Sequence, residues 1–199
     1  MNIVIIKYNA GNIRSVEFAL QRLGIEPEIT ADVEKIKTAD KVIFPGVGEA
    51  STTMKYLREH KLDQLIISLK QPVLGICLGL QLMCKYSEEN DTTCLGIFEE
   101  EVKRFQLPVG EESQNKIPQM GWNTITDLKS GLFDKSLDNQ YVYFVHSYYA
   151  ALGAHTIATT QYCQAFSAAL HKDNFYATQF HPEKSGAIGA RILQNFIEL

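Results

Sequence analysis

The first half of the chain alternates short apolar runs with segments whose apolar residues recur every three or four positions. Residues 3–6 are a continuous β-branched run, which is typical of a strand buried on both faces. Strands are predicted at 3–6, 28–30, 41–44 and 72–76. Helices are predicted at 13–23, with Asn12 as its N-cap, at 51–70 with a break near His60, and at 78–86. This alternation predicts a parallel sheet with helices on both faces.

Beyond residue 93 the pattern changes to strands separated by turn residues. Strands are predicted at 99–105, 122–126, 141–150, 156–161, 166–171 and 175–180, with turns at 108–110, 138–139, 153 and 173–174. Ser185 then precedes a helix that carries Ile188 and Ile192 on one face. We therefore expect one α/β domain over residues 1–199, with a mostly parallel open sheet and antiparallel strands added in the C-terminal half.

Composition and charge narrow the functional classes. Hydrophobic residues make up 45% of the sequence and charged residues 21%, which is ordinary for a soluble globular protein. The formal net charge of −4, without a basic cluster, argues against a nucleic-acid partner. The apolar run at 3–6 is too short for a membrane span and lacks the features of a signal peptide, so we expect a cytoplasmic protein with no membrane partner.

Of the four cysteines, only Cys77 lies in a sequence context that indicates chemistry. Cys77, Cys84, Cys94 and Cys163 have no C-x-x-C spacing, which disfavours a zinc ribbon or a thioredoxin-type site. We expect no metal and no cofactor, and we expect free thiols, three of them small buried hydrophobes. Cys77 differs because Gly75-Ile76-Cys77-Leu78-Gly79 is a G-x-C-x-G pattern between a strand and a helix, the nucleophile-elbow pattern with cysteine in place of serine.

Each part of the elbow pattern has its own physical reason. A tight turn projects the nucleophile above the sheet edge, and small residues two positions before and after it leave room for that turn. The following helix places N–H groups and a positive dipole near the sulfur, which favours the thiolate, and the N–H of Leu78 would bind an oxyanion. The alternative is a buried core thiol with incidental glycines, so the evidence must come from partner residues.

His181 is the predicted base. It follows the strand at 175–180, whose end should lie at the same sheet edge as Cys77. Glu183 could accept the imidazole N–H and complete a Cys-His-Glu triad, or it could be an ordinary carboxylate at a helix start. Surface or capping roles are the alternative for the remaining histidines, most clearly for His60 and His155 and least clearly for His146.

A second oxyanion donor should come from the loop after the strand at 41–44. Gly46, Val47 and Gly48 form this loop, and its glycines allow backbone N–H groups to approach a substrate closely. Taken alone, the same residues would fit an ordinary turn.

Six segments together resemble one family. They are the segments at 8–12, 45–48, 75–81, 118–123, 143–148 and 180–185, and they are similar to those of the triad-type (class I) glutamine amidotransferases. The elbow and His181-Pro-Glu183 indicate only the superfamily. Met120-Gly-Trp-Asn123 and Glu183-Lys-Ser185 resemble the glutaminase subunits of imidazole glycerol phosphate synthases, of histidine biosynthesis, more than relatives serving anthranilate, GMP, CTP or purine synthesis.

This resemblance implies a mechanism. Cys77 would attack the glutamine carboxamide to give a glutamyl thioester and ammonia. His181 would protonate the leaving ammonia and then activate water, while Glu183 would orient His181. The substrate contacts implied by the resemblance are those of Gln81, Ser147 and Tyr148.

The resemblance also implies a partner. Ammonia would pass within a heterodimer to a (β/α)8-barrel cyclase subunit, which makes imidazole glycerol phosphate and an aminoimidazole carboxamide ribotide. Trp122, Asn123 and Lys184 would lie at or near that interface. Lys7 and Asn9 stand where the family more often has an acidic residue and a glycine, and Gln119 stands where a histidine is common. These departures concern the interface and not the triad.

Two other functions remain open at this stage. One is a cysteine peptidase or related hydrolase on a similar elbow fold. The other is a non-enzymatic binding subunit, against which the intact Cys77, His181 and Glu183 argue.

Overall fold

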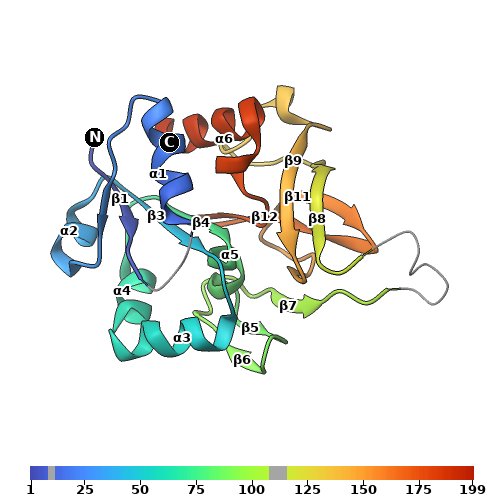
Figure 1. Cartoon of the computed structure of the whole chain (residues 1–199), viewed down its shortest axis with the longest axis horizontal. Coiled ribbons are helices and arrows are strands. Elements are labelled where there is room, and N and C mark those ends of the chain that lie inside the picture. Colours follow the sequence, from blue (N-terminus) through green and yellow to red (C-terminus); the bar gives the residue numbers. More distant parts are fainter. Residues whose placement is uncertain (9–11, 108–115) are drawn as a thin grey trace.

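A seven-stranded sheet runs through the centre of the protein (Figure 1), whose computed structural model describes residues 1–8, 12–107 and 116–199. The strand order is β11-β12-β13-β4-β3-β1-β2. Neighbours are parallel from β2 to β13, and β11 and β12 continue the sheet in antiparallel fashion. The strands are β1 (Ile3–Ile6), β2 (Glu28–Thr30), β3 (Lys41–Gly46), β4 (Val73–Cys77), β11 (Thr156–Tyr162), β12 (Gln164–Lys172) and β13 (Phe175–Thr178).

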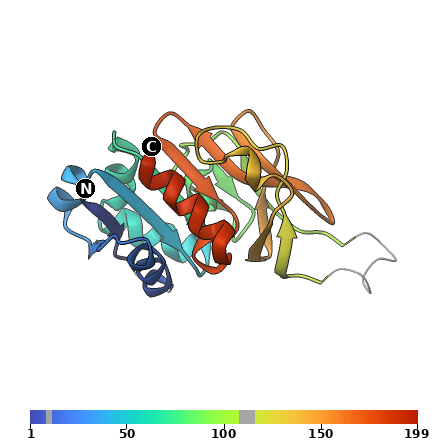
Figure 2. The ribbon, with the colours of Figure 1, turned by 90° about the horizontal axis from the view of Figure 1, so that it is seen from above.

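Helices cover both faces of this sheet, as the alternating pattern predicts. They are α1 (Ile13–Arg22), α2 (Val33–Thr38), α3 (Ala50–Glu59), α4 (Leu62–Ser68), α5 (Leu78–Met83) and α6 (Gly186–Glu198), with short 3₁₀ turns η1 (Lys135–Leu137) and η2 (Pro182–Lys184). Figure 2 shows α6 lying across the central strands. Across the described ranges, no helix has the length and apolar character needed to cross a bilayer.

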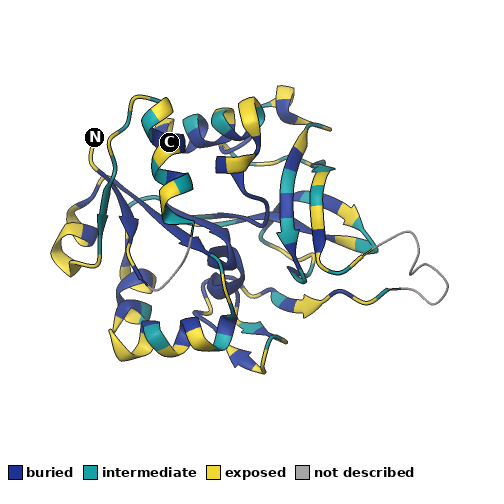
Figure 3. Cartoon of the chain, in the orientation of Figure 1, coloured by how far each residue is buried: buried dark blue, intermediate teal, exposed yellow. Residues whose placement is uncertain are grey.

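Two apolar cores lie on opposite faces of the central strands. Along β1, Ile3 and Ile5 pack with α1 and α6, while Val4 and Ile6 pack with α3 and α4. Alternate side chains of a strand point to opposite faces, so a wholly apolar strand fills both cores. Figure 3 shows the result, with the central strands and α5 buried throughout. Burial on both sides holds the carboxyl ends of β3 and β4 in fixed positions.

Smaller sheets complete the C-terminal half. One has the order β10-β7-β5-β6 and the other pairs β8 with β9. Their strands are β5 (Tyr86–Ser87), β6 (Thr92–Thr93), β7 (Glu101–Arg104), β8 (Gln119–Thr124), β9 (Tyr141–His146) and β10 (Tyr148–Ala150). The predicted strand at 141–150 is therefore two strands in different sheets. The chain changes partner at Ser147, whose carbonyl accepts a hydrogen bond from the N–H of Phe105 at 3.0 Å.

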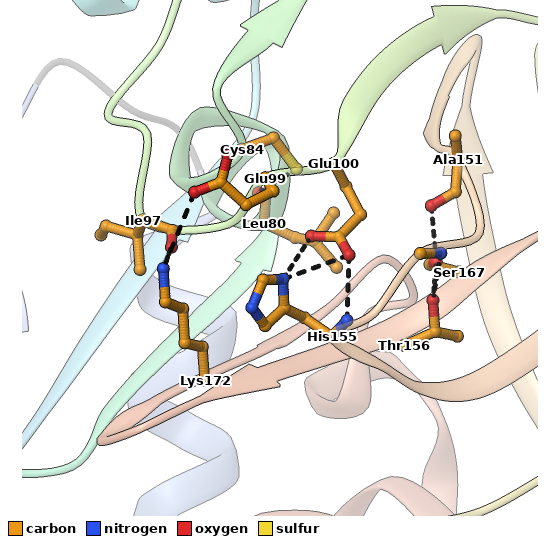
Figure 4. A network of polar contacts seen from close by, with 11 residues as sticks. Leu80, Cys84, Ile97, Glu99, Glu100, Ala151, His155, Thr156, Ser167 and Lys172 are labelled. Carbon is orange, nitrogen blue, oxygen red and sulfur yellow. Dashed lines mark hydrogen bonds and ion pairs between the residues drawn. The ribbon is translucent and has the colours of Figure 1, made fainter.

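Buried polar contacts attach the β7 region to the main sheet (Figure 4). The carboxylate of Glu100 lies 2.9 Å from Nδ1 of His155 and accepts the backbone N–H of the same residue at 3.0 Å. Nearby, the Ser167 hydroxyl donates to the Ala151 carbonyl at 2.8 Å. His155 thus makes a half-buried contact with the buried Glu100, where a surface or capping role was predicted.

Other differences from the predicted elements are local. Helix α2 was not predicted, because it is six residues long and buries only Ile36, too little for a periodic pattern. The predicted helix at 78–86 ends at Met83, since Tyr86 pairs in β5. The predicted break near His60 is confirmed by the separation of α3 from α4. Asn9 and the predicted turn at 108–110 lie outside the described residues.

Replacing Gly79 by alanine is expected to destabilise the protein by about 1–3 kcal/mol, the usual cost of overpacking a core. A Cβ atom on Gly79 would lie 2.1 Å from the backbone oxygen of Phe44, so β3 and α5 would have to separate. Gly131→Ala is the matched control, because its Cβ would meet only the flexible end of Leu199. Urea unfolding followed by circular dichroism measures both, and equal free energies of unfolding for the two variants would contradict the argument.

Candidate active site

Cys77 lies at a strained turn between β4 and α5. Its φ of 54° and ψ of −108° are unusual for a residue other than glycine. Gly46 is its register partner on β3, and a Cβ on Gly46 would lie 2.7 Å from the backbone nitrogen of Gly79. A Cβ on Gly75 would lie 3.1 Å from the carbonyl carbon of Gly79. Three glycines therefore allow β3, β4 and α5 to meet closely beneath the cysteine, in the geometry that the elbow pattern predicts.

His181 and Glu183 form a buried pair just beyond the end of β13. Nδ1 of His181 lies 2.8 Å from Oε1 of Glu183, and Nε2 of His181 is buried with no hydrogen-bond partner in the described part of the chain. The side-chain amide of Asn12 donates to the same Glu183 oxygen. With Nδ1 beside Glu183, Nε2 is the nitrogen left available for proton transfer, as an orienting role of Glu183 would require.

Backbone contacts fix the position of the imidazole. The N–H of His181 donates to the carbonyl of Tyr143 at 2.9 Å, and the hydroxyl of Ser185 donates to the carbonyl of His181 at 2.7 Å. The Ser185 hydroxyl also accepts the N–H of Tyr143 at 2.9 Å. Ser185 precedes α6 as predicted, but its side chain joins β9 to the loop of His181 and makes no helix cap.

Electrostatic effects favour the imidazolium form of His181. Burial lowers the pKa of His181, but the negative charge of a Cys77 thiolate and the hydrogen bond and charge of Glu183 outweigh burial and raise the pKa to about 10. The imidazolium form of His181 would in turn stabilise negative charge on the sulfur of Cys77, the arrangement that activates a cysteine nucleophile.

A cavity of about 400 Å³ opens over these groups, large enough for a small polar substrate. Most of the predicted oxyanion and substrate residues line it together with the nucleophile and base. They are Val47, Gly48, Cys77, Leu78, Gln81, Ser147, Tyr148 and His181. Gly46 packs below the elbow, and Glu183 stands behind His181. In the described ranges, no group of three or more His, Cys, Asp or Glu side chains could hold a metal ion.

Internal hydrogen bonds already occupy some of the predicted substrate contacts. The carbonyl of Ser147 accepts from Phe105. The carbonyl of Tyr148 accepts from Nε2 of Gln81 at 2.8 Å and lies 2.7 Å from Nδ1 of His146. The Tyr148 carbonyl and both protons of the Gln81 amide are thus engaged within the protein, whereas the Ser147 carbonyl keeps a second lone pair.

His146 is a buried wall of the cavity. Burial lowers its pKa to about 4, and the nearby charge of His181 adds to this effect, so its ring is neutral at pH 7. Its Nε2 lies 2.9 Å from the side-chain amide of Gln119. Gln119, one of the departures from the family pattern, is thus buried behind the cavity wall and does not lie on the outer surface.

The structure brings three residues to the site that had no predicted role there. Asn12 holds Glu183, Tyr8 donates its hydroxyl to the carbonyl of Pro45 before the oxyanion loop, and Gln179 lies against Cys77. Burial and the charge of Cys77 raise the pKa of Tyr8 above its usual value, so the phenol stays protonated. Asn12 was predicted to cap α1, but its φ of 70° and its bond to Glu183 replace that cap. No local spacing signals such long-range contacts.

The residues predicted for a partner interface lie on the nearby surface. Trp122 is 55% exposed and packs edge-to-face on Tyr143, the residue that binds the loop of His181. Lys184 is exposed in that same loop. Asn123 is partly buried, and its amide donates to the carbonyl of Gln161 at 2.9 Å.

Comparisons with known proteins agree with this geometry. Residues 4–199 match the family described as "Glutamine amidotransferase class-I". The imidazole glycerol phosphate synthase subunit HisH of Bacteroides fragilis (strain YCH46) is 62% identical over 100% of both chains, and that of Escherichia coli (strain K12) is 45% identical over 100% of both. A crystal structure of a glutamine amidotransferase covers 98% of this chain and 97% of its own with a TM-score of 0.73, and at 21% identity it supports the fold alone.

Proposed function

Because this chain belongs to the class-I glutamine amidotransferase family, we propose that it is the glutaminase subunit of an imidazole glycerol phosphate synthase, in histidine biosynthesis. The observation that carries the proposal is the meeting of Cys77 and His181 in one cavity, with Glu183 on the far side of the imidazole. Full-length relatives with the synthase subunit name support the choice of pathway. Residues 1–199 would act as one amidotransferase domain, because both cores pack on the same central sheet.

The reaction begins with attack of the Cys77 thiolate on the carboxamide carbon of glutamine. Charge develops on the carbonyl oxygen. Val47, Gly48 and Leu78 line the cavity, and their backbone N–H groups would bind that oxyanion. Collapse of the tetrahedral intermediate breaks the carbon–nitrogen bond. The proton on Nε2 of His181 goes to the leaving nitrogen, which departs as ammonia, and a glutamyl thioester remains on Cys77.

The second half of the reaction follows from the same charges. Formation of the thioester removes the thiolate charge that helps to raise the pKa of His181. The imidazole can then take a proton from water, whose oxygen attacks the thioester carbon. Loss of the sulfur releases glutamate, and the sulfur leaves as the thiolate beside a protonated His181. Glu183 keeps the ring oriented in both half-reactions.

The ammonia would be used by a partner. We propose a heterodimer with a (β/α)8-barrel cyclase subunit that makes imidazole glycerol phosphate and an aminoimidazole carboxamide ribotide. The names of the relatives support a subunit role, and the exposed Trp122 and Lys184 beside the His181 loop support a contact surface there. Of the departures from the family pattern, Lys7 is exposed and Asn9 lies outside the described residues.

Labelling with a diazoketone analogue of glutamine tests the proposal against the cysteine peptidase alternative. We expect one covalent adduct on the peptide that contains Cys77, and we expect excess glutamine to prevent it. The buried thiols of Cys84 and Cys94 serve as internal controls, because burial raises the pKa of both. Mass spectrometry locates the adduct, and an unlabelled Cys77 in the folded protein would exclude the glutaminase function.

A further inference from the structure

A chain of two side-chain amides leads from the cavity wall to the nucleophile. Nε2 of Gln81 lies 2.8 Å from the carbonyl oxygen of Tyr148 and 3.1 Å from Oε1 of Gln179. Nε2 of Gln179 in turn lies 3.8 Å from the sulfur of Cys77. Gln81 and Gln179 are both buried, and Gln179 is fully so. None of the reaction steps above uses Gln179.

The Tyr148 carbonyl fixes the direction of both amides. A carbonyl oxygen can only accept hydrogen bonds, so the group that Gln81 turns toward Tyr148 must be its NH₂. The same NH₂ contacts Gln179, whose nearer atom must then be the amide oxygen. The NH₂ of Gln179 is consequently left on the side of Cys77. The polarity of the chain follows from one backbone acceptor and requires no further assumption about either glutamine.

We propose that Gln179 is a hydrogen-bond donor that stabilises the thiolate of Cys77, and that Gln81 holds it in the donating orientation. This inference rests on the proposed role of Cys77 as the nucleophile. A thiolate is a better acceptor than a thiol, and hydrogen bonds to a charged group are stronger than neutral ones, so this contact favours the reactive form. When the thioester forms, the sulfur loses its charge and the donor contributes less, as expected of a group that acts on the nucleophile.

If the Gln179 side chain had only a structural role, we would expect it to make other contacts. Its backbone N–H already donates to the carbonyl of Ala168 at 2.8 Å and keeps the chain in line after β13. The contacts recorded for its amide are those to Gln81 and Cys77. The side chain therefore links the nucleophile to the cavity wall, and its loss should change the reactivity of the Cys77 sulfur.

The pH dependence of Cys77 alkylation by iodoacetamide tests the proposal on the full-length chain. We expect the midpoint of the rate profile to rise by about one pH unit in Gln179→Leu, which means about tenfold slower alkylation below the midpoint. Gln179→Glu keeps the acceptor for Gln81 but turns an oxygen toward the sulfur, and we expect a larger rise. Gln194→Leu is the matched control, because the Gln194 amide binds Glu198 on the exposed face of α6, and we expect an unchanged midpoint.

Folding of each variant is checked by thermal unfolding, and unshifted midpoints in the folded variants would overturn the proposal. A second measurement needs no variant. The side-chain amide proton of Gln179 in wild-type protein should change its NMR shift when Cys77 is alkylated, and an unchanged shift would also overturn it. Iodoacetamide needs no glutamine recognition. Failure of the diazoketone label alone would therefore reject the glutaminase function, whereas unshifted alkylation midpoints alone would reject the role of Gln179.

Discussion

Replacing Cys77 by alanine is expected to reduce glutamine-dependent product formation by at least about 10⁴-fold, because no other group can form the acyl intermediate. The loss corresponds to about 5.5 kcal/mol of transition-state stabilisation. Ammonium supplied in the buffer should restore synthesis in the complex with the proposed cyclase subunit, since ammonia enters the reaction after the step that Cys77 performs. Product formation with glutamine and with ammonium, measured on the same preparation, separates the two halves of the reaction.

Cys163→Ala is the control for this experiment. Cys163 lies in the turn between β11 and β12, outside the residues that line the cavity. We expect its glutamine-dependent rate to stay within about twofold of wild type, because substitutions outside functional features rarely change more. Equal glutamine-dependent rates in Cys77→Ala and wild type would falsify the proposed mechanism. Loss of both the glutamine and the ammonium reactions would instead indicate a failure to assemble.

Replacing His181 by alanine is expected to lower kcat by about 10³–10⁴-fold, since both half-reactions lose their proton carrier. His60→Ala is a suitable control, because its ring stacks on Tyr56 at the exposed end of α3. Glutaminase assays at saturating glutamine measure both variants. A His181→Ala enzyme with wild-type kcat would mean that another group transfers the proton.

The raised pKa of His181 predicts how the stability of the native site depends on pH. Its pKa of about 10 lies above the ordinary value of 6.5, so the imidazolium form stabilises the native site fully below about pH 6.5, and this contribution is lost as pH rises through about 10. In NMR titrations of histidine-labelled protein we expect the midpoint of His181 to fall in Cys77→Ala, which lacks the thiolate, and in Glu183→Gln, which lacks the carboxylate. An unchanged midpoint in both variants would remove the electrostatic basis of the mechanism.

The sequence allowed prediction of those parts of the molecule that depend on local pattern. The strands β1 and β4 are apolar throughout, and β3 is apolar after Lys41, because both faces are buried. A run of this kind is visible without any tertiary information. The elbow at Cys77 was predictable for a similar reason, because its strained turn requires glycines at fixed offsets. Family resemblance then supplied the substrate and the partner.

The parts that escaped prediction depend on contacts between distant segments. Asn12 meets Glu183 across 171 positions, and Gln179 meets Cys77 across 102. An asparagine before a helix suggests a cap, so local propensity favoured the wrong role for Asn12. Nothing in the sequence around Gln179 indicated a role for its side chain. The direction of the two amides required the carbonyl of Tyr148, which only the fold places beside them.

The glycines beneath the elbow have a consequence for how this enzyme can evolve. Gly46, Gly75 and Gly79 bring main-chain atoms of β3, β4 and α5 into direct contact, so the height of Cys77 above the sheet is set by backbone and not by side chains. Backbone atoms are common to every sequence. Drift among the surrounding core residues can therefore alter stability without changing the position of the sulfur. The corresponding constraint is that a side chain at Gly46 or Gly79 would collide with main-chain atoms.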